Sequence, residues 1–105
     1  MASQEYWTIE QGPSKMDLML ALFDGETMGT RTVTFGINMA GRTLAQVTMI
    51  ILGVEHEDGS GDSWIVQGRP VNINNGRPVK CEAVRFYYHT KTRKGTTRPF
   101  IVVVP

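Results

Sequence analysis

The chain has 105 residues, of which 41% are hydrophobic and 20% are charged. This size and composition predict a single globular domain over residues 1–105, and they exclude a disordered tail or a fibre. No apolar run approaches the roughly 18 residues that a membrane helix needs. The net charge of +1 conceals a split: residues 1–62 hold three basic and nine acidic residues, whereas residues 63–105 hold eight basic residues against Glu82. Such a split indicates either an anion-binding surface or pairing of opposite charges between the two parts.

Cysteine content and the first residues indicate the compartment. Cys81 is the single cysteine, which excludes an internal disulfide and leaves no zinc-type cysteine spacing. The first residues, Met-Ala-Ser-Gln-Glu, lack the basic region followed by an apolar block that marks a secretory signal. We therefore expect a cytoplasmic protein that does not associate with membranes and needs no cofactor.

The first part of the chain predicts a short extended segment and then a helix. Aromatic and β-branched residues over 5–10 are typical of an edge strand or an ordered arm, which ends at Gly12 and Pro13. Ser14 with Asp17 three residues later is a helix-start pattern, so the sequence predicts a helix over 15–23. The apolar residues at helical spacing in this segment are Met16, Met19, Leu20 and Phe23.

The remainder of the chain predicts β-structure. From Thr30 onward β-branched and aromatic residues dominate, and clusters of Gly, Asn and Asp separate them. In the long run 43–57 both faces are apolar, so we expect its middle to be buried on both sides, with a bend or bulge at Gly53. The sequence 74–76, Asn-Asn-Gly, is typical of a hairpin turn. The predicted strands are 31–38, 43–57, 63–68, 78–90 and 98–104.

These elements predict a mainly β fold, a small antiparallel barrel or sandwich of about five strands with one short N-terminal helix. The order of a helix, a sheet and one long bent strand resembles the Sm-like small barrels over roughly residues 14–104. In that family the segment after the bent strand contributes a Met-Asn pair to an RNA-base pocket. Here that segment, residues 57–62, reads Glu-Asp-Gly-Ser-Gly-Asp, so the resemblance implies the architecture and not the pocket.

The predicted strand over 78–90 carries the pattern most informative about function. Large apolar residues change face near Ala83 and Val84, as a bulge would cause, so that Arg85, Tyr87 and His89 point outward together. Aromatic and guanidinium planes stack on bases while cations neutralise phosphates, so we expect contact with single-stranded nucleic acid or another polyanion. The alternative is a solvated basic hairpin that discourages strand aggregation. The predicted contact residues are Arg85, Tyr87, His89, Lys91, Arg93, Lys94 and Arg98.

The predicted helix is hydrophobic almost all round, and a helix of this kind is buried on more than one side. We expect a homo-oligomer whose interface includes the apolar set named above. The alternative is a helix that closes the open end of its own barrel. The interface residues predicted are Met16, Met19, Leu20 and Phe23.

We find no sequence frame for catalysis or metal binding. No serine lies in a nucleophile elbow, and no phosphate-binding glycine loop occurs. The acidic turn 55–62 lacks the calcium-loop frame, and His56 and His89 are too few for a typical zinc site. We therefore expect a non-enzymatic binding module without metal. The alternatives are an oligomeric scaffold or accessory domain that binds a protein or small ligand, and an enzyme with a pocket at the barrel mouth.

Overall fold

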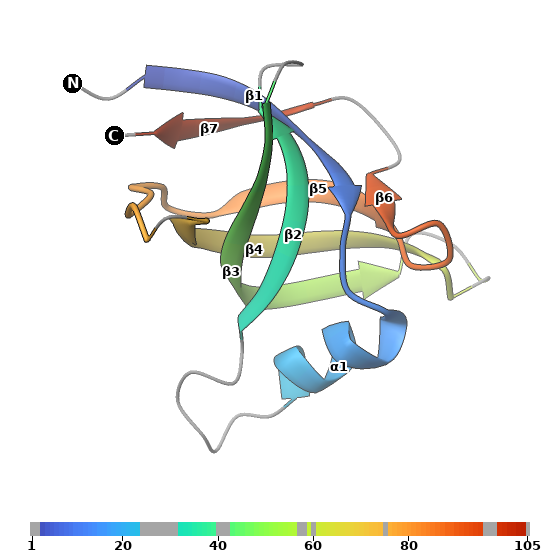
Figure 1. The fold of residues 1–105 in the computed structure, drawn as a ribbon. Helices are drawn as coiled ribbons and strands as arrows, with labels where there is room; N and C mark the ends of the chain where they lie inside the picture. Colours follow the sequence, from blue (N-terminus) through green and yellow to red (C-terminus); the bar gives the residue numbers. More distant parts are fainter. Residues whose placement is uncertain are drawn as a thin grey trace.

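The computed structural model describes residues 3–23, 32–39, 43–56, 59, 61–74, 76–95 and 99–104. These residues form one seven-stranded antiparallel sheet in the order β6-β5-β4-β3-β2-β1-β7, with one helix (Figure 1). The prediction of a mainly β fold with one short helix is confirmed, with seven strands in place of about five. The elements are β1 (Ser3–Gln11), α1 (Lys15–Phe23), β2 (Thr32–Met39), β3 (Thr43–His56), β4 (Ser63–Ile73), β5 (Val84–His89), β6 (Lys94–Gly95) and β7 (Phe100–Val104).

The sheet curls so that its two ends approach each other. Phe86 of β5 and Phe100 of β7 stack across the gap with ring centroids 5.0 Å apart. β6 lies equally close to β1, because a Cβ atom added to Gly95 would be 3.5 Å from the Cβ of Ile9. The sheet is thus a half-barrel, and a seam without paired strands runs between β5–β6 on one side and β7–β1 on the other.

Inward-facing side chains of the strands fill the half-barrel with a continuous apolar core. Phe35 packs edge-on against Phe86 and Tyr88, with ring centroids 5.4 Å and 5.6 Å away. Burial of side chains this large contributes most of the folding free energy in a domain of this size. The largest fully buried side chains are Trp7, Trp64, Tyr88, Phe35, Leu18, Ile37, Met49, Ile51, Val47, Val66, Val102 and Pro70.

The first strand differs from the prediction of an edge strand or arm. β1 lies inside the sheet, paired with β2 on one side and with β7 on the other. Trp7 and Ile9 point into the core because a strand with neighbours on both sides can bury one of its faces fully. The sequence does not reveal this position, because it is created by the last strand of the chain.

The long strand β3 also differs from the prediction. Val47, Met49 and Ile51 are buried, but Leu52 on the other face is half exposed, so burial on both sides is wrong. The outer face of a curled sheet has no second layer in the described chain to cover it. The predicted bend is confirmed, because the pairing with β4 shifts register between Ile51 and Gly53.

The predicted strand 78–90 is divided in two. Val79 donates its N–H to the carbonyl of Val71 at 3.2 Å, after which the chain leaves the sheet and rejoins it at Val84, opposite Gly68. Pro70 in β4 has no N–H to offer a neighbouring strand, which favours an interruption at this place. The interruption changes the register as the sequence pattern indicated, and it turns Val84 and Phe86 into the core.

The local sequence determines where helix α1 begins and which of its sides is buried. The Asp17 N–H donates to Ser14 Oγ at 3.2 Å, which confirms the predicted helix start. Leu18 and Ala21 are buried against the sheet, and the helix lies below the end of the half-barrel, beside β2 and β3 (Figure 1). The nine-residue helix is far shorter than a membrane crossing requires, and the described residues contain no helix that meets this requirement.

The loop between β1 and α1 is fixed by one buried tyrosine. Tyr88 is fully buried, and its hydroxyl donates to the carbonyl oxygen of Pro13 at 2.7 Å. Gly12 lies directly over the ring: a Cβ at this position would come within 2.7 Å of Tyr88 Cε1 and Cζ. The loop can therefore cross the ring only where residue 12 has no side chain.

We expect Gly12→Ala to lower the free energy of unfolding by about 1–3 kcal/mol, because the added methyl group displaces either the ring or the loop. Chemical denaturation monitored by tryptophan fluorescence measures this change. Gly59→Ala is the control, since a Cβ there meets nothing within 4 Å, and it should change the stability by less than about 0.5 kcal/mol. Equal stability of the two variants would contradict the close approach of Gly12 to Tyr88.

Candidate nucleic-acid interface

The outward face of β5 presents three side chains in a row. Val84, Phe86 and Tyr88 are buried, whereas Arg85 and Tyr87, which alternate with them, are exposed and His89 is half-buried. A strand places alternate side chains on opposite faces, so the packing of the buried set determines the direction of the exposed set. The structure thus brings the first three predicted contact residues together on one surface.

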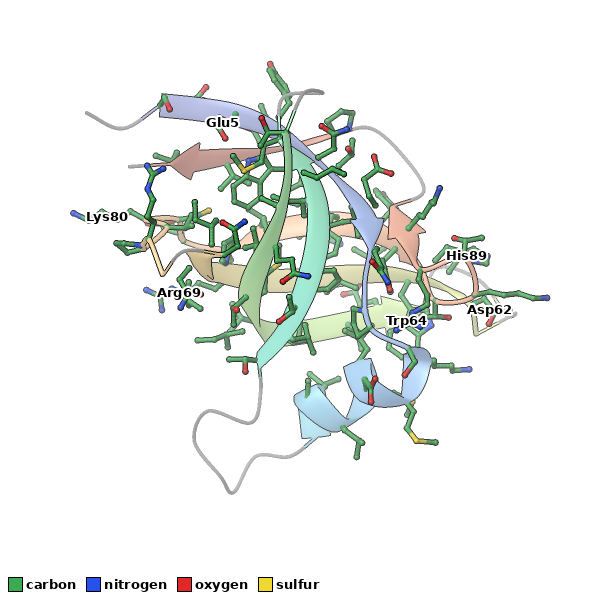
Figure 2. The ribbon with its side chains drawn as sticks, viewed as in Figure 1. Glu5, Asp62, Trp64, Arg69, Lys80 and His89 are labelled. Atoms are coloured by element: carbon green, nitrogen blue, oxygen red, sulfur yellow. The ribbon has the colours of Figure 1, made fainter. Side chains whose placement is uncertain are left out.

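The neighbouring strands extend this surface. On β4, Gln67 lies opposite Arg85 and Ile65 lies opposite Tyr87, while Lys94 of β6 lies opposite His89. The sequences of β4, β5 and β6 contain no acidic residue. Arg69 continues the outward face of β4, and Figure 2 shows it and Lys80 at one end of these strands with His89 at the other. We call the outward face of these three strands the basic face.

Two carboxylates approach the basic face from other strands. Glu55 of β3 pairs with Arg85 at 3.7 Å between Oε2 and Nη2, with side chains 73% and 63% exposed. An ion pair this exposed stabilises by roughly 0–1 kcal/mol, so Arg85 exchanges this partner for another anion at little cost. Glu10 of β1 lines a small hollow in the seam together with Lys94 and Tyr87. Lys94 therefore has an acidic residue across the seam.

Hydrogen bonds hold the turn between β5 and β6. The Arg93 N–H donates to the His89 carbonyl at 2.7 Å, and the Thr92 N–H donates to His89 Nδ1 at 3.3 Å. Lys91 is exposed on this turn, so a positive charge stands at the end of the Arg85-Tyr87-His89 row.

Arg93 has a structural role that the sequence did not indicate. Its backbone has a positive φ of 62°, and its Nε donates to the carbonyl of Gly12 at 2.8 Å. This bond joins residues 81 positions apart, which no local pattern reveals. Arg93 and Tyr88 thus both hold the β1–α1 loop, so the guanidinium of Arg93 has a structural partner and is not one of the side chains of the basic face.

The remaining predicted site residues fall into two groups. Arg98 lies outside the described residues, and so does the side chain of Phe23. Met16, Met19 and Leu20 are exposed on the side of α1 that faces away from the sheet. Among the residues that the structure describes, no three His, Cys, Asp or Glu side chains come together as a metal site would require.

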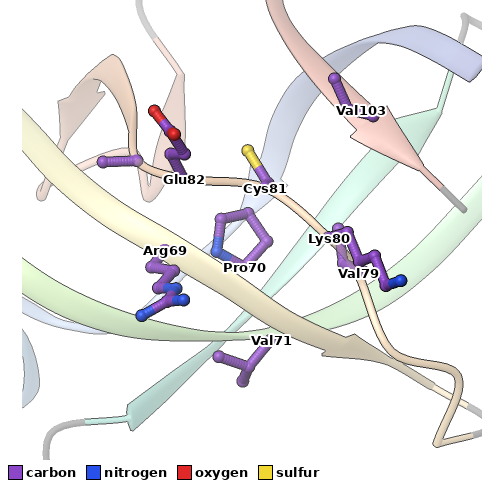
Figure 3. A pocket seen from close by; sticks show the side chains of 9 residues that line it. Arg69, Pro70, Val71, Val79, Lys80, Cys81, Glu82 and Val103 are labelled. Atoms are coloured by element: carbon purple, nitrogen blue, oxygen red, sulfur yellow. The ribbon is translucent and has the colours of Figure 1, made fainter. Parts of the chain in front are cut away.

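Sequence reasoning missed a groove at the opposite end of the seam. Its volume is about 740 Å³, and it lies where the chain leaves the sheet after Val79 (Figure 3). Residues 79–83 line one wall, Arg69 and Pro70 lie beneath, and Val103 of β7 lines the other side. The groove forms because the five residues 79–83 span the same stretch as only three residues of β4, 69–71. This mismatch is set by strand pairing, so no sequence motif reveals it.

Comparison with known proteins gives no further guide: no protein-family model matches the chain, and neither a curated protein nor a solved structure matches it.

Burial raises the pKa of Tyr88 to about 12, and the nearby charge of Arg93 offsets part of this rise. In the unfolded chain a tyrosine ionises near pH 10. Between pH 10 and 12 the unfolded state therefore loses a proton that the folded state keeps. The unfolded state then binds fewer protons, so the free energy of unfolding falls as the pH rises through this range.

We expect the stability of the wild-type protein to fall by about 1–2 kcal/mol between pH 10 and 12 through Tyr88 alone. Urea denaturation at several pH values measures this fall. Tyr88→Phe removes the titrating group, so its stability should depend less on pH in this range, although it loses about 1 kcal/mol at pH 8 with the hydrogen bond to Pro13. Identical pH profiles for both proteins would refute a buried, neutral Tyr88.

Proposed function

We propose that this protein is a non-enzymatic binding module that holds single-stranded nucleic acid, or another polyanion, against its basic face. The observation that carries the proposal is the outward row of Arg85, Tyr87 and His89 on a surface whose three strands contain no acidic residue. A solvated surface that only discourages aggregation needs lysine, but it does not need an exposed tyrosine between a guanidinium and an imidazole.

The proposed contacts divide into stacking and charge neutralisation. Successive outward side chains on a strand are about 6.7 Å apart, so Tyr87 offers a ring to a base while Arg85 and His89 flank it. Lys91 and Arg69 lie beyond the two ends of this row and suit contact with phosphates. Because the backbone charge dominates such binding, the affinity should fall steeply as salt rises.

Anisotropy titrations with a fluorescein-labelled oligo-dT and oligo-U at several salt concentrations test the proposal. We expect Tyr87→Ala to weaken binding about tenfold or more while the salt dependence stays unchanged, because stacking is lost and no charge is removed. The double variant Arg85→Ala/Lys91→Ala should make the slope of log K against log salt shallower by about 1–2.

Two variants at matched positions are the controls. Tyr6→Ala removes a tyrosine that is 59% exposed on β1, compared with 39% for Tyr87, and Lys15→Ala removes a cation from α1. Both should bind as the wild type does. Absence of binding at low salt, or equal losses in the control and test variants, would refute the proposed interface.

The exposed side of α1 favours a second candidate function, an oligomeric scaffold. Met16 and Leu20 are each more than half exposed beside Met19, and a contiguous apolar helix face on a small domain is typical of an interaction surface. We propose homo-oligomerisation through this face as the alternative role. The buried Leu18 and Ala21 on the other side show that the helix also covers its own sheet.

For this alternative we expect Met16→Glu/Leu20→Glu to reduce the molar mass measured by light scattering at several hundred micromolar. The charges would have to be buried in the interface, which is unfavourable. Leu44→Glu, which replaces a leucine on β3 that is even more exposed than Leu20, should leave the mass unchanged. A wild-type protein that stays at its monomer mass of 11.7 kDa would contradict the alternative.

The thiol of Cys81 bears on the cellular compartment of the protein. We propose the cytoplasm, because Cys81 is a free thiol in the structure and reducing compartments keep such thiols reduced.

A further inference from the structure

A small hollow lies in the seam where the two ends of the sheet meet. Its volume is about 170 Å³, and residues of β1, β5, β6 and β7 line it. The seam is narrow here because β6 lies beside β1 (Figure 1). Pockets for drug-sized ligands measure about 300–1,000 Å³, so this hollow, which we call the seam hollow, has room for one flat ring system and not for a larger molecule.

Opposite charges line the seam hollow without neutralising each other. Glu10 of β1 and Lys94 of β6 are both lining residues, yet their charged groups lie more than 4.0 Å apart, too far for an ion pair. The Thr8 hydroxyl donates to Glu10 Oε1 at 3.2 Å, which holds the carboxylate on its own strand. No other described residue donates to this carboxylate and none accepts from the Lys94 ammonium, so both groups are open to a ligand.

Aromatic side chains form the rest of the seam hollow. The buried ring of Phe86 stacks on Phe100 with centroids 5.0 Å apart, so the apolar floor is held in place. Tyr87 follows Phe86 on the outward face of β5 and also lines the hollow. A nucleic-acid strand that stacks one base on Tyr87 therefore passes the opening of the seam hollow, into which the next base can turn.

Guanine is the base whose edges match these groups. Its N1–H and its N2 amino group donate side by side, as a carboxylate requires, and its O6 and N7 accept from a lysine on the adjoining edge. Adenine and cytosine place a ring-nitrogen acceptor beside their amino group, and thymine and uracil place carbonyl oxygens beside their N–H, so each would aim a lone pair at the carboxylate. Glu10 also repels phosphates, so a base and not the backbone enters the hollow.

We propose that the seam hollow binds one guanine base of the single strand that lies on the basic face. Glu10 accepts from the N1–H and the N2 amino group, and Lys94 donates to O6 and N7. The inference rests on the proposed function, to which it adds a base preference. It extends the contact surface from the row that contains Tyr87 to the seam beside it.

Anisotropy titrations that compare a labelled oligo-dT with the same oligonucleotide carrying one central guanine test the inference. We expect the wild type to bind the guanine form about tenfold more tightly, because a bidentate contact to a base discriminates at this level. Hypoxanthine in place of guanine lacks the N2 amino group and should lose most of this gain. 7-Deazaguanine lacks the N7 acceptor and should bind more weakly than guanine.

The matched variants are Glu10→Gln and Glu82→Gln. Glu10→Gln keeps the size of the side chain but turns one acceptor into a donor, so it should abolish the guanine preference. Its affinity for oligo-dT should be at least that of the wild type, because a negative charge near the strand is removed. Glu82→Gln removes the same charge from an exposed position at the other end of the seam, and it should keep the preference.

Circular dichroism and thermal melting establish whether the variants fold, and the base analogues decide the question with the unaltered protein if Glu10→Gln does not. Binding of all oligonucleotides with equal affinity would overturn the inference and leave the proposed function standing. Absence of binding to every oligonucleotide at low salt would overturn both. A guanine preference that survives in Glu10→Gln, or that hypoxanthine retains in full, would also overturn the inference, because the preference would then arise outside the seam hollow.

Discussion

The burial of Tyr88 is the constraint on which the rest of the structure depends. Its ring packs against Phe35, which fixes the inner face of β5, and its hydroxyl holds the carbonyl of Pro13. Because the inner face is fixed, Arg85 and Tyr87 must point outward. Because the loop is held, α1 starts at a defined position below the half-barrel. One side chain therefore couples the orientation of the basic face to the placement of the helix, although the two lie far apart in sequence.

A second feature is the interruption beside Pro70 in the pairing between β4 and the segment that follows the hairpin. The chain responds by leaving the sheet after Val79 and rejoining it two residues out of register at Val84. This single interruption has two effects. It directs Arg85, Tyr87 and His89 away from the core, and it opens the groove beside β7. The proposed binding face and the groove thus both lie next to this interruption.

Local patterns were sufficient to predict some of these features. The helix over 15–23, its start at Ser14, the bend at Gly53 and the register change before Val84 all follow from residues close in sequence. Features set by distant partners were not predictable in this way. The interior position of β1 depends on β7, the exposure of Leu52 depends on the curl of the sheet, and the tie between Arg93 and Gly12 depends on both ends of the chain.

The charge split along the sequence becomes a charge split in space. β1 carries Glu5 and Glu10, and these carboxylates accept hydrogen bonds from Trp7 and Thr8 of their own strand. The strands β4, β5 and β6, farther along the sheet, carry only basic charges. The curl brings β1 and β6 together along one line, where Glu10 and Lys94 share the seam, while Arg69, Arg85 and Lys91 lie away from it. For the proposed polyanion contact, this distribution places cations on the outer face of β4 and β5 and carboxylates on β1, a polarity that favours approach along the row that contains Tyr87.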